Sequence, residues 1–260
     1  FKDIWIQPAA GDAGGALGAA YVLYYNELDN IRKVDKLDQM KGSYLGPSFS
    51  DDEVINELNE CEAKFKKFSE EEIINITAKE ISNGKAIGWM NGRMEFGPRA
   101  LGNRSILADP RSPFMQKQLN LKIKYRESFR PFAPSVLSQY QDDWFDLNIK
   151  SPYMLMVGNI KEDKRLVLPK DFNKLFGLSK LNSQISKVPA ITHVDFSARI
   201  QTILKKTNPK FYRLVEQFYK MTGCPMVVNT SFNVRGEPIV CSPKDAFNCF
   251  MGTELDILVI

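Results

Sequence analysis

The segment KAIGWMNGRMEFGPRALGNRSILADPR occupies residues 85–111, and the rest of the chain can be interpreted around it. It begins with KAIGWMN and also contains SILAD, two short apolar runs that predict buried strands. The loop between them is rich in glycine, proline and arginine. Strand and helix patterns alternate from here to the end of the chain, which predicts an α/β domain over residues 85–260.

The loop is too cationic for ordinary core and predicts an anion-binding site. Glycine lets backbone N–H groups approach a ligand, and the planar guanidinium of arginine matches the oxygens of phosphate or carboxylate. The arginines of this loop are Arg93, Arg99 and Arg104, and Arg111 follows the second apolar run. A second basic block, KIKYRESFRPFAPSV, contributes Lys124, Arg126 and Arg130. Together they suit a ligand with several negative charges, such as a nucleotide plus another phosphate.

A structural explanation of the same arginines stays open. They can form a solvated surface, or ion pairs with Glu95, Asp109 and Glu127. For any single arginine this is the simpler interpretation.

Capping residues mark several helices. Capping boxes at residues 50–53 and 69–72 predict helices near 51–67 and 70–82. Three more helices are predicted downstream: SPFMQKQLNLKIK, a helix from Asn208 and Pro209 to Gly223, and one that begins at Ser242 and Pro243. PMVVN and the terminal LDILVI are typical of strands.

The first residues predict a separate unit. FKDIWIQP at 1–8 is typical of a strand, and Gly15 to Leu28 of an amphipathic helix. KGSYLGPSFS then resembles a linker. Because the chain begins with Phe1 rather than Met, we expect a piece of a longer protein. The lysine-rich residues 159–188 predict a mobile insertion or a loop over a cleft.

Composition narrows the classes of protein. A hydrophobic content of 43% is enough for a sizeable core, and 35 basic against 31 acidic residues give a charge of +4 that requires no nucleic acid. Four cysteines and one histidine form no zinc pattern, so reduced thiols are expected. No apolar run of membrane-spanning length and no leader are visible, so we expect a cytoplasmic protein without a membrane partner.

Several polar residues are candidates for chemistry. Asn229 and Ser231 follow the PMVV strand, where side chains often face a ligand, although NTSFN also fits a simple polar turn. Arg199 lies in a largely small and apolar segment and would need a partner if buried. His193 and Asp195 would share one face of a strand, but a lone histidine is more often structural.

Five blocks of the sequence resemble one known family. They are QPAAGDAGGALGAA at 7–20, YLGPSFSDDEV at 44–54, the two basic blocks, THVDFSARIQTI at 192–203, and NTSFNVRGEPIVCSPKDAFNCF at 229–250. In this order they are similar to the NodU/CmcH-type O-carbamoyltransferase family, which includes tobramycin O-carbamoyltransferase. Five ordered blocks are far more specific than one short motif.

The resemblance implies a fold with two parts. Residues 1–42 would be the C-terminal tail of an actin-like (ASKHA) domain, the rest of which lies upstream. Residues 43–260 would form a YrdC-like domain with a twisted mixed sheet and flanking helices. Asp12, which by itself fits a helix N-cap, would be one ligand of a site for Fe²⁺ or another divalent metal.

The resemblance also implies an activity. Carbamoyladenylate would form from carbamoyl phosphate and ATP, with Mg²⁺ assisting the nucleotide, and the carbamoyl group would pass to a hydroxyl of a small-molecule acceptor. Matching the motifs assigns substrate contacts to Arg99, Lys124, Arg130, Arg199, Asn229 and Ser231, all but Arg99 as catalytic residues. Arg126 and His193 are further candidates for substrate binding. Phe196 stands where the family usually has glycine.

Two other functions stay open. A threonylcarbamoyl-AMP synthase acting for tRNA would share the YrdC-like fold, but those enzymes lack the DAGGALGAA and EFGPRALG segments. A non-catalytic nucleotide-binding module is the second, against which the intact Lys124, Arg130 and Asn229 weigh. The sequence identifies neither the acceptor nor the oligomeric state, and a homodimer stays open.

Overall fold

The strands form one mixed sheet. The structure is a computed structural model that describes residues 4–34, 38–168, 171–181 and 183–260, without the side chains of Asp12, Asn173 and Leu178. The described strands are β1 (Ile87–Met90), β2 (Arg104–Ala108), β3 (Ala133–Leu137), β4 (Phe145–Asp146), β5 (Met156–Ile160), β6 (Ser197–Ile203), β7 (Met226–Ser231) and β8 (Ile257–Val259). Their order in the sheet is β4-β5-β6-β3-β7-β2-β1-β8. Strands β3 and β6 are parallel, as are β1 and β8, and the other neighbours are antiparallel.

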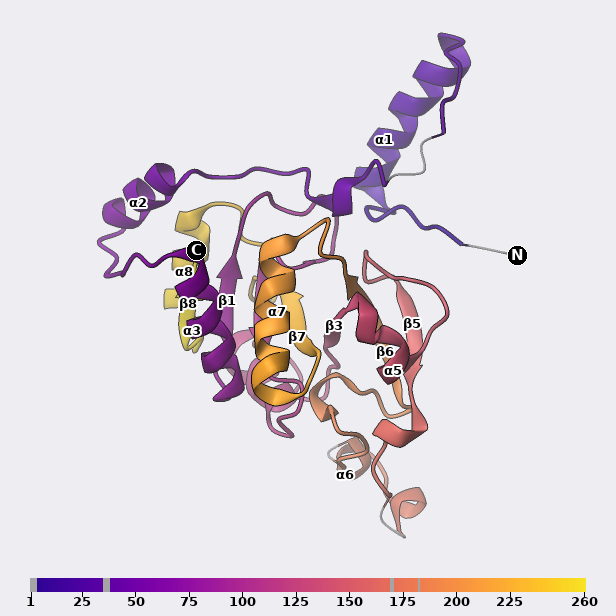
Figure 1. The fold of residues 1–260 in the computed structure, drawn as a ribbon, viewed down its shortest axis with the longest axis vertical. Helices are drawn as coiled ribbons and strands as arrows, with labels where there is room; N and C mark the ends of the chain where they lie inside the picture. Colours follow the sequence, from indigo (N-terminus) through magenta and orange to yellow (C-terminus); the bar gives the residue numbers. More distant parts are fainter. Residues whose placement is uncertain (1–3, 35–37, 169–170, 182) are drawn as a thin grey trace.

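Helices flank this sheet, which confirms the predicted α/β class. The described α-helices are α1 (Asp12–Val22), α2 (Asp51–Glu60), α3 (Glu70–Ser82), α4 (Met115–Gln118), α5 (Gln141–Trp144), α6 (Leu178–Leu181), α7 (Pro209–Thr222) and α8 (Pro243–Met251). Helices α3 and α7 lie side by side over the sheet (Figure 1). Helix α4 continues into a π-helical turn, Leu119–Ile123, so the helix predicted over 112–124 is confirmed with a change of pitch.

Local capping signals fix the starts of α2, α3, α7 and α8 and the end of α7. The predicted capping boxes are present at the starts of α2, α3 and α8. Helix α7 begins where the side chain of Asn208 accepts the N–H of Phe211 at 3.2 Å, and it ends at the left-handed Gly223. Helix α2 ends at Glu60, earlier than predicted, because the chain turns at Glu62, whose φ is 53°.

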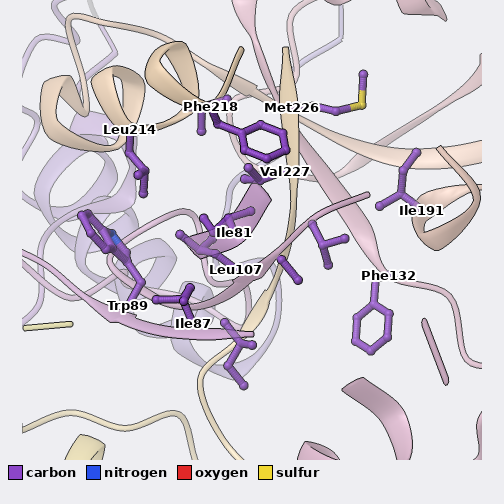
Figure 2. Packing of buried hydrophobic residues seen from close by; sticks show 14 of the residues in the cluster. Ile81, Ile87, Trp89, Leu107, Phe132, Ile191, Leu214, Phe218, Met226 and Val227 are labelled. Atoms are coloured by element: carbon purple, nitrogen blue, oxygen red, sulfur yellow. The ribbon is translucent and has the colours of Figure 1, made fainter. Parts of the chain in front are cut away.

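The main core lies between the sheet and its helices. Ile81 of α3, Trp89 of β1, Leu107 of β2, and Leu214 and Phe218 of α7 are all fully buried (Figure 2). Burying a side chain of this size stabilises the fold by about 1.5–3 kcal/mol. The core therefore joins elements that are far apart in the sequence.

The N-terminal region differs from its prediction. Within the described residues 4–8 there is no strand, so that part of the predicted opening strand is wrong. Helix α1 begins at Asp12 and extends away from the body of the molecule (Figure 1). None of its described side chains is fully buried, although Leu17 packs against a small cluster that includes Leu101 and Met154. Ile31 and Val34, which follow it, are 84% and 81% exposed.

The lysine-rich residues 159–188 are packed only in part where the structure describes them, since Val167 and Phe176 are 97% and 92% exposed. They include the end of β5 and the short α6. Phe172, Ile185 and Val188 are buried in them, at 6%, 5% and 0% exposure. These residues anchor parts of the segment, and its role as a mobile insertion or a loop over a cleft stays a prediction.

Two further features concern the helices and the cysteines. In the part of the chain that the structure covers, no helix combines the length and the apolar character that crossing a bilayer requires. All four cysteines are free, as predicted.

Candidate functional site

Arg99 and Arg199 are two cations of the site whose charges influence each other. Arg99 lies in the loop between β1 and β2, and Arg199 lies on β6. Burial, and then the charge of Arg99, lower the pKa of Arg199 to about 10, so the two guanidinium groups are close enough to repel each other. Arg199 still carries its charge at neutral pH. The sequence predicted both residues as ligand contacts but did not show that they face each other.

Both arginines have unused hydrogen-bonding capacity. The Nε of each is buried and has no partner among the described residues. Neither arginine forms an ion pair within the described residues. The arginines that do are Arg111, Arg130, Arg213 and Arg235. A buried donor without an acceptor costs free energy, so two such cations side by side indicate a place for an anion.

Asn229 adds an acceptor to the two donors. Its Nδ2 donates to the carbonyl of Ala100 at 3.2 Å, and to Ser135 Oγ and Gln201 Oε1 at 2.9 Å each. These three oxygens fix the amide, and its Oδ1 is buried without a partner among the described residues. Asn229 therefore ties the Arg99 loop to strands β3 and β6, and it offers an oxygen to a ligand N–H.

The sheet places these residues together. Asn229 on β7 pairs with Ala133, the first residue of β3. On its other side β3 pairs with β6, where Gln201 lies opposite Ser135. Arg199 and Gln201 are two residues apart on one strand and so lie on the same face. Gln201 was not predicted as a site residue, although its position two residues after Arg199 would place both on the same face of a strand.

Lys124 is buried and already surrounded by protein oxygens. Its Nζ is hydrogen-bonded to the carbonyl and hydroxyl of Ser231, and to the carbonyl and side chain of Asn233. Burial, and then the charge of Arg126, lower the pKa of Lys124 to about 7. Lys124 therefore fixes the end of β7, and Ser231 is occupied with Lys124 and Asn233. Their predicted contacts with substrate stay predictions.

Arg126 and Arg130 form the remainder of the second basic block. Arg126 donates from Nε to Asn120 Oδ1 at 2.6 Å, and its guanidinium lies 5.0 Å from the centre of the Phe132 ring. Burial and then Arg130 lower the pKa of Arg126. Arg130 is exposed and pairs with Glu127 at 3.0 Å. The block runs directly into β3, beside Asn229.

Three other arginines have structural roles instead. Arg104 is fully buried and donates to main-chain carbonyls, among them that of Asn91 at 3.1 Å. Arg111 pairs with Asp109 at 2.6 Å, and the exposed Arg93 donates to the carbonyl of Leu45. The sequence left open that these arginines form ion pairs with nearby carboxylates. Arg111 does so with Asp109, and the exposed Arg130 does so with Glu127.

His193 and Asp195 lie in a turn before β6, so the prediction that they share a strand face is wrong. His193 Nδ1 is 3.1 Å from Asp195 Oδ1. Hydrogen bonds from Ser197 are the main reason that the pKa of Asp195 is lowered to about 2. His193 also lines a cavity of about 310 Å³ with Phe129 of the second basic block and Lys180 of the lysine-rich segment.

Phe196 adopts a backbone conformation that is unusual for a residue other than glycine. Its φ is 65°, a left-handed conformation that glycine adopts without strain. Its ring lies 4.6 Å from the Arg165 guanidinium, so it packs in the same turn.

The N-terminal segment contacts the Arg99 loop. A side chain at Gly97 would lie 3.1 Å from the carbonyl of Pro8. Both polar atoms of the Gln7 side chain are buried without partners among the described residues. The N-cap of α1 is Gly11, and the side chain of Asp12 lies outside what the structure describes. Elsewhere in the described chain no three His, Cys, Asp or Glu residues could hold a metal, so the metal site stays a prediction.

The chain matches longer proteins over its whole length. An uncharacterized protein of Synechocystis sp. is 55% identical over 100% of this chain and 43% of its own length. The nodulation protein NolO of Bradyrhizobium diazoefficiens is 40% identical over 100% of this chain and 44% of its own. This chain therefore spans less than half the length of these relatives.

Full-length HypF, solved in its phosphate- and nucleotide-bound form, superposes with a TM-score of 0.46 at 15% identity, over 88% of this chain and 30% of that one. A score this low supports no argument by itself. The model of the family described as "Carbamoyltransferase C-terminus" matches residues 78–260, a range that includes Arg99, Arg199 and Asn229. The chain belongs to the carbamoyltransferase C-terminus family.

Proposed function

We propose that this chain is the carbamoyladenylate-forming part of an O-carbamoyltransferase. The observation that carries the proposal is that three buried atoms, Arg99 Nε, Arg199 Nε and Asn229 Oδ1, have no partner in the part of the chain that the structure describes. Carbamoyl phosphate offers oxygens to the two donors and an amide N–H to the acceptor. Two positive charges side by side also suit an anion better than a neutral ligand.

The chemistry needs positioning and charge more than a strong base. Water cleaves carbamoyl phosphate to carbamate and phosphate, and a carbamate oxygen then attacks the α-phosphorus of ATP. The bond to pyrophosphate breaks, and carbamoyladenylate remains. Because carbamate is already ionised, no general base is required. Arg99 and Arg199 would offset the repulsion between the two anions, and Arg126 and Arg130 would bind the nucleotide phosphates, with Mg²⁺ brought by ATP. Lys124 would hold their block against the end of β7.

The proposal divides the longer protein between two domains. Residues 1–42 would be the tail of an upstream actin-like domain, which would transfer the carbamoyl group to a hydroxyl of a small-molecule acceptor. Apolar residues exposed in the N-terminal region support this, because Trp5, Ile31 and Val34 would gain cover from such a domain. Asp12 would contribute to its metal site for Fe²⁺ or another divalent metal. A cytoplasmic location follows from these substrates.

Pyrophosphate release tests the proposal directly. The purified chain is given ATP and Mg²⁺ with and without carbamoyl phosphate. We expect release that depends on carbamoyl phosphate, and no carbamoylated acceptor. If ATP binds but no pyrophosphate appears even when the upstream segment is restored, the chain is a nucleotide-binding module and the proposal is wrong.

Replacing Arg99 tests the anion site within that assay. Arg99→Ala is expected to weaken the binding of carbamoyl phosphate by about 2–5 kcal/mol, because it removes one partner of a buried charged contact. Calorimetric titration measures the change. Arg93→Ala is the control, since Arg93 is exposed and donates only to the Leu45 carbonyl. Equal losses in the two variants would mean that Arg99 is an ordinary surface cation.

A further inference from the structure

The loop that carries Arg99 needs support from outside itself. Hydrogen bonds of the Asn229 amide to the Ala100 carbonyl and to Gln201 bring the Arg99 loop beside β6, which carries Arg199. There the charge of Arg99 lowers the pKa of Arg199, an unfavourable interaction of like charges. Residues 96–103 form no helix or strand, and Gly97 and Gly102 have φ values of 134° and 108°. Such a loop would relax by moving Arg99 away from Arg199 unless other groups held it.

Glu95 closes the base of this loop. Its side chain is buried, and a single oxygen, Oε1, accepts the N–H groups of Leu101 at 2.6 Å, Asn103 at 2.8 Å and Arg104 at 3.4 Å. Burial raises the pKa of Glu95, while these N–H groups and the charge of Arg104 lower it. Because the Glu95 carboxyl binds main-chain N–H groups, it stabilises the conformation of the loop and forms no ion pair with Arg99.

Arg104 supplies the complementary half of this support. Its guanidinium donates to the carbonyls of Asn91 and Gly92 at 3.1 and 3.2 Å on the incoming side of the loop, and to that of Asn103 at 2.9 Å on the outgoing side. Three N–H groups at the end of the loop thus go to Glu95, and three carbonyls that flank the loop go to Arg104. Asn229 and Gln201 hold the next carbonyls, of Ala100 and Leu101, from the sheet.

We infer that Glu95 is a positioning residue for Arg99. With Arg104 it fixes the loop so that the Arg99 guanidinium stays beside Arg199 when no anion is bound, and the site is formed before substrate arrives. The inference rests on the proposed function, because it takes Arg99 to bind carbamoyl phosphate. Preorganising two like charges in this way lowers the cost of binding an anion between them.

A double-mutant cycle on the 260-residue chain tests the inference. Binding of carbamoyl phosphate is measured by calorimetry for the native chain, Glu95→Ala, Arg99→Ala and the double variant. Glu95→Ala is expected to weaken binding at least tenfold in the native background and less than twofold in the Arg99→Ala background, because it acts through Arg99. Equal factors in both backgrounds would overturn the inference.

Further variants separate positioning from general stability. Glu95→Gln keeps an oxygen that can accept the same N–H groups, so it is expected to bind better than Glu95→Ala. If Glu95→Ala does not fold, the cycle is run with Glu95→Asp, whose carboxylate is one methylene shorter. Glu72→Ala is the matched control, because Glu72 also accepts a main-chain N–H, that of Ser69 at 2.8 Å on α3, and should lower stability without affecting binding.

The ¹⁵N heteronuclear NOE of the arginine Nε–H groups gives a readout without any ligand. We expect the Arg99 Nε to be rigid in the native chain and mobile in Glu95→Ala, while the Arg199 Nε stays rigid in both. An unchanged Arg99 signal overturns the positioning role even if substrate binds. Failure of the native chain to bind carbamoyl phosphate, with the expected NOE change present, would instead count against the proposed function alone.

Discussion

Lys124 shows how burial sets the charge of a single residue. A free lysine titrates near 10.4, whereas burial lowers the pKa of Lys124 to about 7 in the folded chain. Between these two values the unfolded chain binds more protons than the folded one, so Lys124 makes stability rise as pH increases. Its contribution is least favourable near pH 7 and below.

The pH dependence of unfolding checks this value. The free energy of unfolding of the native chain, minus that of Lys124→Met, is expected to increase from pH 7 to pH 9.5 by at most about 1.4 kcal/mol per pH unit. Chemical denaturation at several pH values gives both curves. Parallel curves would mean that Lys124 titrates as an ordinary exposed lysine.

At the scale of elements, the Arg99 loop depends on close contact with α7. Gly102 has a φ of 108°, and a Cβ atom there would lie 2.3 Å from the Phe211 ring. Gly102→Ala is therefore expected to cost about 2–6 kcal/mol, the sum of backbone strain and overpacking. Gly84→Ala is the control: its φ is 83° and nothing lies within 4 Å, so only about 1–3 kcal/mol of strain is expected. Equal losses in denaturation would show that α7 yields to the added methyl group.

At the scale of the whole molecule, residues 4–34 are peripheral to the main core. The buried members of that core all come from residue 78 onward, and the described apolar residues of the N-terminal region are largely exposed. A chain without residues 1–37 is expected to unfold cooperatively within about 4 °C of the parent, since roughly 1 kcal/mol corresponds to 2–4 °C at this size. It should also bind less of the dye ANS. Loss of the cooperative transition would show that the N-terminal region is part of the folding unit.

The sequence alone determined most of the helices and strands, because their signals are local. Capping residues at 50–53, 69–72 and 242–245, and the pair Asn208 and Gly223, fix helix ends through contacts within a few positions. Apolar runs likewise predicted β1, β2 and β7. The prediction failed where no local signal exists, as at the absent strand in residues 4–8 and the early end of α2.

Only the tertiary structure decided what each cation does. Arg99 and Arg104 are five residues apart in one basic loop, yet Arg104 is enclosed by carbonyls, while the buried Nε of Arg99 has no acceptor among the described residues. Lys124, which the sequence grouped with the free cations, is occupied by oxygens more than a hundred residues away. Residue type and spacing set the charge of these side chains. The hydrogen-bond partners of these side chains come from segments that are distant in the sequence and that the sheet brings together. A local sequence pattern does not identify such partners.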